Sequence, residues 1–355
     1  MKINWRVLLA VSIVPQILVL KLLARFPNFV ERFYSNGLYV FISKLMRYAF
    51  GWLPFSFGDL FYTTVVIYAL RWLFVNRKRF VRDTKHWFLE VLTAVSVGYF
   101  AFHLLWAFNY YRLPLHTSLD IERDYTTEQL VDLTQKLILK TNDLQLELMK
   151  SDTLKVEMPY SKREMLRKIP DGYDVLAKEF THLAYNPRSV KPSLYSLPLT
   201  YMGFSGYLNP FTNEAQIDDL IPKYKFPTTG SHEVAHQLGY AAENEANFIG
   251  SMAAMQHPDV FFNYSGYAFA LRHCLHELYL RAPETYEELV LHVNVGVLKN
   301  YQEMREFWAG YENPTEPLFK TTYNNFLKAN NQADGMASYS YVVALLVNYY
   351  EKHPF

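Results

Sequence analysis

The feature that most constrains this chain is a run of 21 residues without a formal charge, from Val91 to Tyr111. A helix of about 20 apolar residues spans the hydrocarbon core of a bilayer, and aromatic residues like those at the end of this run suit its interface. The run therefore predicts a membrane-spanning helix over residues 89–111. At least part of the chain is then expected to lie in a membrane.

Two further apolar stretches precede this run. Residues 58–75 form a second predicted span, in which Arg71 near one end extends its charged head to the interface. Residues 5–24 form the first span if Lys21 does the same. The first stretch by itself resembles a signal peptide, but no small-x-small cleavage site follows it, which favours an uncleaved span. If one weak stretch were instead a buried amphipathic helix, the placement of everything downstream would be reversed.

The charges of the chain are unevenly distributed. Residues 1–111 carry 13 Lys and Arg against 4 Asp and Glu, whereas residues 112–355 carry 22 against 30. Basic residues crowd the loop at 77–85, which the positive-inside rule assigns to the cytoplasm. Three crossings then place residues 112–355 on the extracytoplasmic side of the inner membrane. This acidic part argues against a nucleic-acid partner, so the expected partners are the lipid bilayer and a peptide or protein substrate.

Residues 112–355 are predicted to form one mainly α-helical domain with a small sheet, separate from the anchor at 1–111. Thr126 and Gln129 form a capping pattern before leucines at helical spacing. Residues 187–227 are rich in Pro, Gly, Ser, Thr and aromatic residues, which predicts short strands and turns. The single cysteine, Cys274, excludes an intramolecular disulfide framework.

The candidate chemistry lies at His232-Glu233-Val234-Ala235-His236. Positions four apart lie on one face of a helix, so both imidazoles can bind one metal ion while Glu233 acts on a neighbouring water molecule. This is the HExxH pattern of zinc metallopeptidases, and the predicted cofactor is one Zn²⁺ per chain. The helix is expected to stop at Gly239, which adopts a left-handed conformation readily.

A catalytic zinc needs a third protein ligand and an open position for water. Glu243 and Glu245 are both suitable, and Glu243 is preferred because Glu243-x-x-Ala246-Asn247 resembles the metal-binding helix of gluzincin-type membrane peptidases. That resemblance implies that Asn247, in place of the usual Asp, supports the first histidine through its amide oxygen. An acidic helix N-terminus would explain one of the two carboxylates without any metal.

A peptidase also needs a donor for the developing oxyanion and a surface that aligns the substrate. The candidate donors are Tyr339, Tyr264 and Tyr267, with ordinary core packing as the alternative for each. An edge strand that pairs with an extended peptide is predicted at Glu214, Ala215, Gln216 and Ile217, although a plain hairpin strand would have the same pattern. The HxxHE segment at 273–277 is not the inverted zinc motif and predicts one face of an amphipathic helix.

Several segments together resemble one family: the exit from the third span at 109–115, FSGYLNPFTNEA, HEVAHQLGYAAENEANF and LKANNQADGMASYSYVV. It is a bacterial membrane family catalogued as domain of unknown function 3810 and regarded as zinc-peptidase-like because of its HExxH. The resemblance covers nearly the whole chain. It implies the roles given above for His232, Glu233 and His236, and it marks Glu243 and Glu245 as family positions. It implies no substrate.

The sequence thus predicts a membrane-anchored, zincin-like metallopeptidase in which Glu233 is the general base for a zinc-activated water. One alternative is a non-catalytic membrane sensor or scaffold whose metal site is structural or degenerate, with a closed coordination shell. Another is a zinc hydrolase of a non-peptide amide, such as a cell-wall or lipid-linked substrate, whose cavity would lack an edge strand. The sequence leaves the oligomeric state open.

Overall fold

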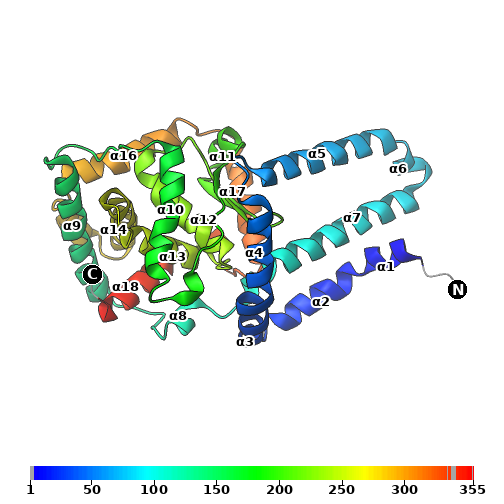
Figure 1. Cartoon of the computed structure of the whole chain (residues 1–355), viewed down its shortest axis with the longest axis horizontal. Helices are drawn as coiled ribbons and strands as arrows, with labels where there is room; N and C mark the ends of the chain where they lie inside the picture. The colour runs from blue at the N-terminus through cyan, green and yellow to red at the C-terminus, as the bar shows by residue number, and fades with distance from the viewer. Residues whose placement is uncertain (1–3, 334, 337–340, 354) are drawn as a thin grey trace.

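The computed structural model describes residues 4–333, 335–336, 341–353 and 355. Long helices extend from one end of a larger helical body (Figure 1). Three segments are long and apolar enough to cross a membrane: Trp5–Leu23, built from α1 (Trp5–Val11) and α2 (Ile13–Leu23), α5 (Phe57–Asn76) and α7 (Thr84–Leu105). The prediction of three apolar N-terminal segments is confirmed. Most of their side chains are exposed, as expected for surfaces that face lipid.

The third span differs from its prediction at both ends. It begins at Thr84 and ends at Leu105, six residues before the predicted end at Tyr111. The chain then turns into the 3₁₀ helix η2 (Ala107–Tyr111), most of which is buried in the body. The indole N–H of Trp106 donates a hydrogen bond of 3.0 Å to the carbonyl of His236. The aromatic cluster after α7 therefore attaches the end of the span to the body.

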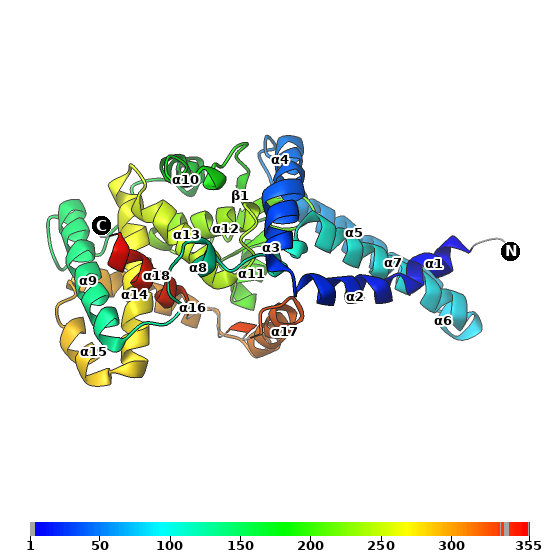
Figure 2. The ribbon, with the colours of Figure 1, turned by 90° about the horizontal axis from the view of Figure 1, so that it is seen from below.

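The segment between the first and second spans is also part of the body surface. It forms α3 (Pro27–Phe29), the π-helix η1 (Val30–Leu38) and α4 (Tyr39–Phe50). Both views place α4 between the body and the long helices (Figures 1 and 2). The hydroxyl of Tyr39 donates a hydrogen bond of 2.9 Å to the carbonyl of Gln237, and the buried guanidinium of Arg47 lies 5.3 Å from the ring centre of Tyr185. The anchor and the body thus share one interface of buried side chains.

Most of the body is α-helical, as predicted, around a large apolar core. Thr126 caps α9 (Thr127–Met149) and Ser161 caps α10 (Lys162–Leu176), each in a reciprocal capping box, so the predicted cap at Thr126 is confirmed. The other long helices are α12 (Phe226–Gln237), α13 (Glu243–Met255), α14 (Val260–Arg281), α16 (Val295–Ala309), α17 (Glu316–Ala329) and α18 (Val342–Lys352). The short elements are α6 (Arg79–Arg82), α8 (Leu115–Ser118), η3 (Thr181–Leu183), α11 (Ser196–Met202), η4 (Lys223–Lys225) and α15 (Pro283–Val290).

The small sheet has three strands among the described residues, β1 (Val190–Pro192), β2 (Gly206–Asn209) and β3 (Glu214–Ile217), in the order β1-β3-β2. β3 pairs in parallel with β1 and antiparallel with β2. The prediction of an edge strand at 214–217 is therefore wrong: Glu214, Ala215, Gln216 and Ile217 form the central strand, and neither of its edges is open. The edge strand in this hairpin is β2.

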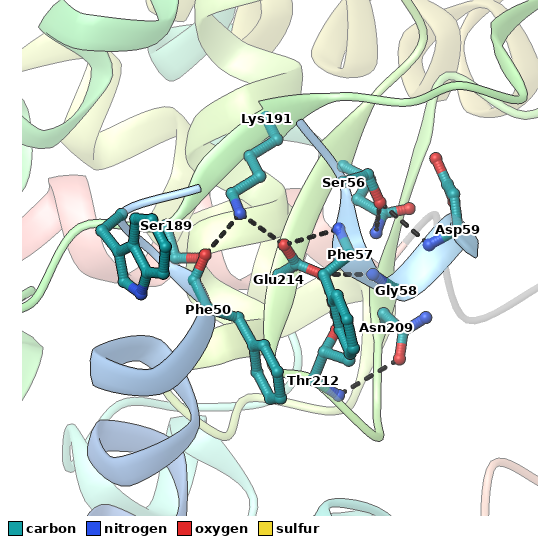
Figure 3. A network of polar contacts seen from close by, with 12 residues as sticks. Phe50, Ser56, Phe57, Gly58, Asp59, Ser189, Lys191, Asn209, Thr212 and Glu214 are labelled. Carbon is teal, nitrogen blue, oxygen red and sulfur yellow. Dashed lines mark hydrogen bonds and ion pairs between the residues drawn. The ribbon is translucent and has the colours of Figure 1, made fainter. Parts of the chain in front are cut away.

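The N-terminus of α5 is attached to this central strand through Glu214, which is fully buried (Figure 3). Its carboxylate accepts hydrogen bonds from the backbone N–H groups of Phe57 at 3.1 Å and Gly58 at 2.5 Å. The ammonium of Lys191 on β1 lies 2.5 Å from the same carboxylate. A negative charge at the start of a helix satisfies free N–H groups and the helix dipole. One candidate span thus begins directly on the sheet.

A second buried carboxylate connects α5 to the neighbouring strand. Asp59, in the first turn of α5, accepts hydrogen bonds from the hydroxyl of Ser193 at 3.0 Å and the backbone N–H of Leu194 at 2.6 Å. The hydroxyl of Tyr207 on β2 donates to its other oxygen. The edge strand is therefore held by the same helix end that holds the central strand.

Candidate metal site

Helix α12 carries the HExxH residues through the centre of the body. It begins with Pro227 in its first turn and ends before Gly239, whose φ of 91° is the left-handed conformation predicted for that position. α13 crosses α12 closely because Gly250 has no side chain: a Cβ there would lie 2.6 Å from the backbone nitrogen of His232. This close crossing brings the first turn of α13 beside the two histidines.

Three side chains converge at this crossing. The Nε2 atoms of His232 and His236 lie 3.3 Å and 3.6 Å from Oε2 of Glu243. The potential ligand atoms of the three residues all lie within 4.8 Å of one another. Two imidazole nitrogens and one carboxylate oxygen are a donor set that suits Zn²⁺. Of the two glutamates considered from the sequence, the structure brings Glu243 to the histidines.

Glu245 has a different role. Its Oε1 atom accepts a hydrogen bond of 2.7 Å from the backbone N–H of Leu115, which holds the chain after η2 against α13. Burial raises the pKa of Glu245 to about 7, against the lowering effect of the nearby guanidinium of Arg112. Arg112 itself pairs with Glu31 at 2.6 Å. Glu245 therefore belongs to the junction between anchor and body.

The two histidines are oriented differently. The Nδ1 atom of His236 lies 2.7 Å from the carbonyl oxygen of Tyr240, so this nitrogen carries a proton, and Nε2, which faces Glu243, is the nitrogen that can give up its proton and bind a metal ion. The buried Nδ1 of His232 has no hydrogen-bond partner among the described residues. The support expected from Asn247 is therefore not made: Asn247 is buried and lines the cavity, but it does not hold His232.

Electrostatics in the cluster favour an ionised Glu243. Burial alone would raise the pKa of its carboxyl group, but the positive charge of His236 and hydrogen bonds from both histidines hold that pKa well below its usual range. Burial lowers the pKa of His232. For His236 burial also acts to lower the pKa, but the charge of Glu243 outweighs it and raises the value to about 9. Both histidines thus lie beside an anionic oxygen. A negative charge next to two imidazole nitrogens is an environment that favours a bound cation.

Glu233 lies beside this group in the wall of the same cavity. Its side chain is buried, and Oε2 has no hydrogen-bond partner in the described part of the chain. Burial raises the pKa of its carboxyl group to about 8. Gly206 on β2 makes room for it, since a Cβ at that position would lie 2.8 Å from Oε1 of Glu233. A buried carboxylate with no structural hydrogen bond to that oxygen is a candidate for proton transfer.

These residues line a cavity of about 670 Å³. The outer strand β2 contributes Gly206, Tyr207 and Leu208 to its wall. Much of the remaining wall is aromatic, and part of it comes from the candidate spans, including Tyr62 of α5 and Phe102 of α7. The cavity therefore reaches from the cluster on α12 to the ends of two candidate membrane spans.

Two of the tyrosines predicted as oxyanion donors, Tyr264 and Tyr267, do not lie in this cavity. Tyr264 is in the core, where its hydroxyl donates a hydrogen bond of 2.7 Å to Asn300, and Tyr267 packs near the C-terminus against Phe355. Neither lines the cavity. Tyr339 lies outside the described residues. The sequence around Tyr264 and Tyr267 did not indicate their packing partners, Asn300 and Phe355, which come from distant segments.

Two cavity residues were missed by the sequence reasoning. The hydroxyl of Tyr323 on α17 donates a hydrogen bond to Oε1 of Glu243 from the wall of the cavity. His273, predicted only as part of an amphipathic face at 273–277, also lines the cavity. Tyr323 is 80 residues from Glu243 in sequence, and no local pattern connects them. The helical spacing at 273–277 predicted one face of a helix, but it did not indicate that this face of α14 borders the cavity.

Comparison with known protein families matches residues 34–347 to the family described as Protein of unknown function (DUF3810). The match covers most of the chain and spans both the anchor and the body, so the chain belongs to this family. Neither the curated proteins nor the solved structures contain a significant match. The resemblance stated from the sequence is therefore confirmed as family membership, and the function of the family is not known.

Proposed function

We propose that this protein is a membrane-anchored, zinc-dependent peptide hydrolase. The observation that carries the proposal is the convergence of His232, His236 and Glu243 within 4.8 Å, beside the buried carboxylate of Glu233, in the wall of a large cavity. A metal site with a purely structural role would need neither a cavity nor a neighbouring carboxylate such as Glu233, whose Oε2 has no hydrogen-bond partner among the described residues.

The three residues fit a catalytic zinc ion. Their donor set is two imidazole nitrogens and one carboxylate oxygen, and the hydrogen bond from His236 to the Tyr240 carbonyl leaves Nε2 available as a ligand atom. When bound, zinc supplies Lewis acidity, which lowers the pKa of water and polarises a carbonyl group. Three protein ligands leave a fourth position open for water or substrate, unlike the closed shell of a structural site.

Glu233 acts as the general base in this proposal, in the ionised form that a bound cation would favour over the protonated form that burial favours. It accepts a proton from the attacking water and later passes it to the leaving amine of the cleaved peptide bond. Tyr323 lies in the same wall, and its hydroxyl, which donates its single proton to Glu243, would turn from that carboxylate to donate a hydrogen bond to the substrate's carbonyl oxygen. In this proposal it takes the role that the sequence analysis considered for Tyr264 and Tyr267, which lie outside the cavity wall.

The peptide substrate is aligned by β2. In the described part of the chain this strand pairs through one edge only, with β3, and Gly206, Tyr207 and Leu208 line the cavity. An extended peptide can add to such an edge by backbone hydrogen bonds. The missing side chain at Gly206 lets the strand come close to Glu233. A helix with both histidines, a following helix with the glutamate and an adjacent edge strand support a zincin-like arrangement.

The catalytic body is placed on the extracytoplasmic side of the membrane. The basis is the basic loop at 77–85 between the second and third spans, which the positive-inside rule assigns to the cytoplasm. Residues 112–355, which are acidic overall, then lie outside. This orientation supports substrates that are extracytoplasmic or that emerge from the bilayer.

The test is cleavage of a peptide library by the zinc-loaded, detergent-purified protein, followed by mass spectrometry. The wild type is expected to cleave, and Glu233→Gln is expected to lose at least 10²-fold in rate while keeping its zinc. Glu277→Gln, on α14 and outside the cavity wall, is the matched control and should cleave normally. Zinc binding without cleavage of any peptide or amide, in both wild type and Glu233→Gln, would favour the sensor or scaffold.

A further inference from the structure

The cavity has two chemically different ends along α12. At the C-terminal end of the helix, the carbonyls of His236 and Gln237 accept hydrogen bonds from Trp106 and Tyr39 of the anchor. At the other end lies Lys225, which precedes α12 and also lines the cavity. Twelve helical steps of about 1.5 Å separate Lys225 from Gln237, or roughly 18 Å. The cationic end therefore points away from the anchor.

Lys225 shares one helix face with the metal-site residues. Positions 225, 229, 232 and 236 follow the spacing of four, three and four that keeps side chains on one face. Lys225, Thr229, His232 and His236 all line the cavity. Lys225 and His232 are seven positions apart, which corresponds to about 10 Å along the helix, or roughly three residues of an extended peptide. One substrate can reach both.

No acidic group neutralises Lys225. Among the described residues, no carboxylate lies within 4.0 Å of its ammonium group, and it is the only lysine or arginine in the described cavity wall. The ammonium lies 4.1 Å from the ring centre of Phe269, and that ring lies 4.4 Å from the ring of His273. Lys225 is therefore a half-buried cation that lies over the ring of Phe269 in the cavity and has no counter-ion among the described residues.

The charges that act on Lys225 and His273 are positive. Burial, and then the charge of Arg272, lower the pKa of Lys225 to about 7. Burial also lowers the pKa of His273 to about 3, and Lys225, Arg272 and His276 add to that effect. An anion bound here would relieve the repulsion and favour the charged form of Lys225. This end of the cavity is thus electrostatically suited to a negative group.

We propose that Lys225 and His273 form a subsite for a carboxylate of the peptide substrate, two or three residues from the scissile bond on the side away from the membrane. The inference rests on the proposed hydrolase function and names its substrate class: peptides with an apolar stretch, held by the aromatic wall near the spans, and an acidic residue beyond the cleaved bond. The neutral imidazole of His273 contributes a hydrogen bond, and Lys225 contributes the charge.

A phospholipid headgroup is the other source of an anion. The geometry disfavours it, because the candidate spans contribute Tyr62 and Phe102 to the cavity wall, whereas Lys225 lies at the end of α12 opposite its contacts with the anchor. A headgroup at the level of the spans' ends would not reach it. The headgroup is therefore an outcome that the test must distinguish.

The test measures binding, so it does not depend on turnover. Zinc-loaded, full-length Glu233→Gln is titrated with pairs of acetylated, amidated apolar peptides that differ only in Glu or Gln, placed three residues before or after the centre. In one of the two pairs, the one whose variable residue reaches Lys225, the Glu peptide is expected to bind about tenfold more tightly than the Gln peptide. Adding Lys225→Gln should abolish the preference, His273→Gln should reduce it, and Lys225→Arg should keep it. The control is Lys223→Gln, at an exposed lysine two residues away.

Zinc content and Tm are measured for every variant, so that misfolding is recognised. Equal affinity for Glu and Gln peptides, no binding of either, or a preference that survives Lys225→Gln would overturn the subsite. So would a Lys225-dependent affinity for short-chain phosphatidylglycerol in place of the Glu peptide. Failure of the wild type to hydrolyse any peptide, with the Lys225-dependent preference intact, would instead count against the proposed chemistry alone.

Discussion

The backbone N–H of Gly58 donates a hydrogen bond of 2.5 Å to the carboxylate of Glu214 (Figure 3). The first residue is at the start of a candidate membrane span, and the second is on the central strand of the sheet. The next strand, β2, lines the cavity and reaches Glu233. The start of α5 therefore supports the cavity wall through the sheet: it is bonded to β3, and β3 pairs with β2, which lines the cavity.

Glu214→Gln should destabilise the protein strongly, because it leaves the buried ammonium of Lys191 without a counter-charge. Removing one partner of a buried ion pair costs about 3–5 kcal/mol, which should appear as a clear fall in Tm. The same substitution at Glu303, whose pair with Lys155 is partly exposed, should cost less than about 1 kcal/mol. Equal shifts in Tm for the two variants would contradict the structural role given to Glu214.

Gly206→Ala should impair catalysis by obstructing Glu233. The new Cβ would lie 2.8 Å from Oε1 of Glu233 and 2.7 Å from the carbonyl oxygen of Gln216, so one of them must move. We expect a loss of about 10²-fold in kcat/KM with zinc content unchanged. Gly98→Ala is the control, since a Cβ there meets nothing within 4 Å. Wild-type rates for Gly206→Ala would show that β2 does not need to approach Glu233.

Tyr323→Phe should weaken both metal binding and turnover. The phenol hydroxyl donates a hydrogen bond to Glu243, and loss of such a partner of a ligand typically reduces metal affinity by about 10- to 100-fold. Zinc affinity is measured by competition with a chelator, and kcat on the best library peptide. Tyr286→Phe, which removes a hydroxyl outside the cavity, should change neither quantity. An unchanged zinc affinity for Tyr323→Phe would assign the hydroxyl to some other role.

Zinc should stabilise the folded protein. A metal that binds only the native state at about 100 times its Kd adds roughly 2.7 kcal/mol to the free energy of unfolding. Chelator-stripped wild type should therefore gain Tm when zinc is restored, whereas His236→Ala should gain nothing. Magnesium serves as the ion control, because two imidazoles and one carboxylate match zinc far better. A Tm that does not respond to zinc in the wild type would contradict a native zinc site.

Local patterns predicted those parts of the structure that depend on local interactions. The uncharged stretches indicated three apolar helices, and the spacing of His232 and His236 placed both imidazoles on one face. The left-handed Gly239 after α12 was predicted from the same segment. Each of these depends on helix periodicity or on backbone preferences within a few residues.

Features that depend on tertiary contacts were not predictable. Residues 214–217 alternate in the same way whether they form a central strand or an edge strand, and only the parallel pairing with β1 distinguishes the two. The third span ends at Leu105 because Trp106 finds an acceptor on α12, 130 residues away. The sequence analysis did not single out Lys225, because Phe269 and His273, which lie beside it in the structure, come from the distant helix α14.

The most direct test of the central claim is the metal content of the detergent-purified protein by elemental analysis, compared between Glu243→Ala and Glu245→Ala. Both residues are in the first turn of α13, but of the two only Glu243 lies within 4 Å of both histidines, and Glu245 accepts a hydrogen bond from the backbone of Leu115. The account predicts about one zinc per chain in the wild type and in Glu245→Ala, and almost none in Glu243→Ala. A wild type without zinc, or a Glu243→Ala variant that keeps it, would contradict the account.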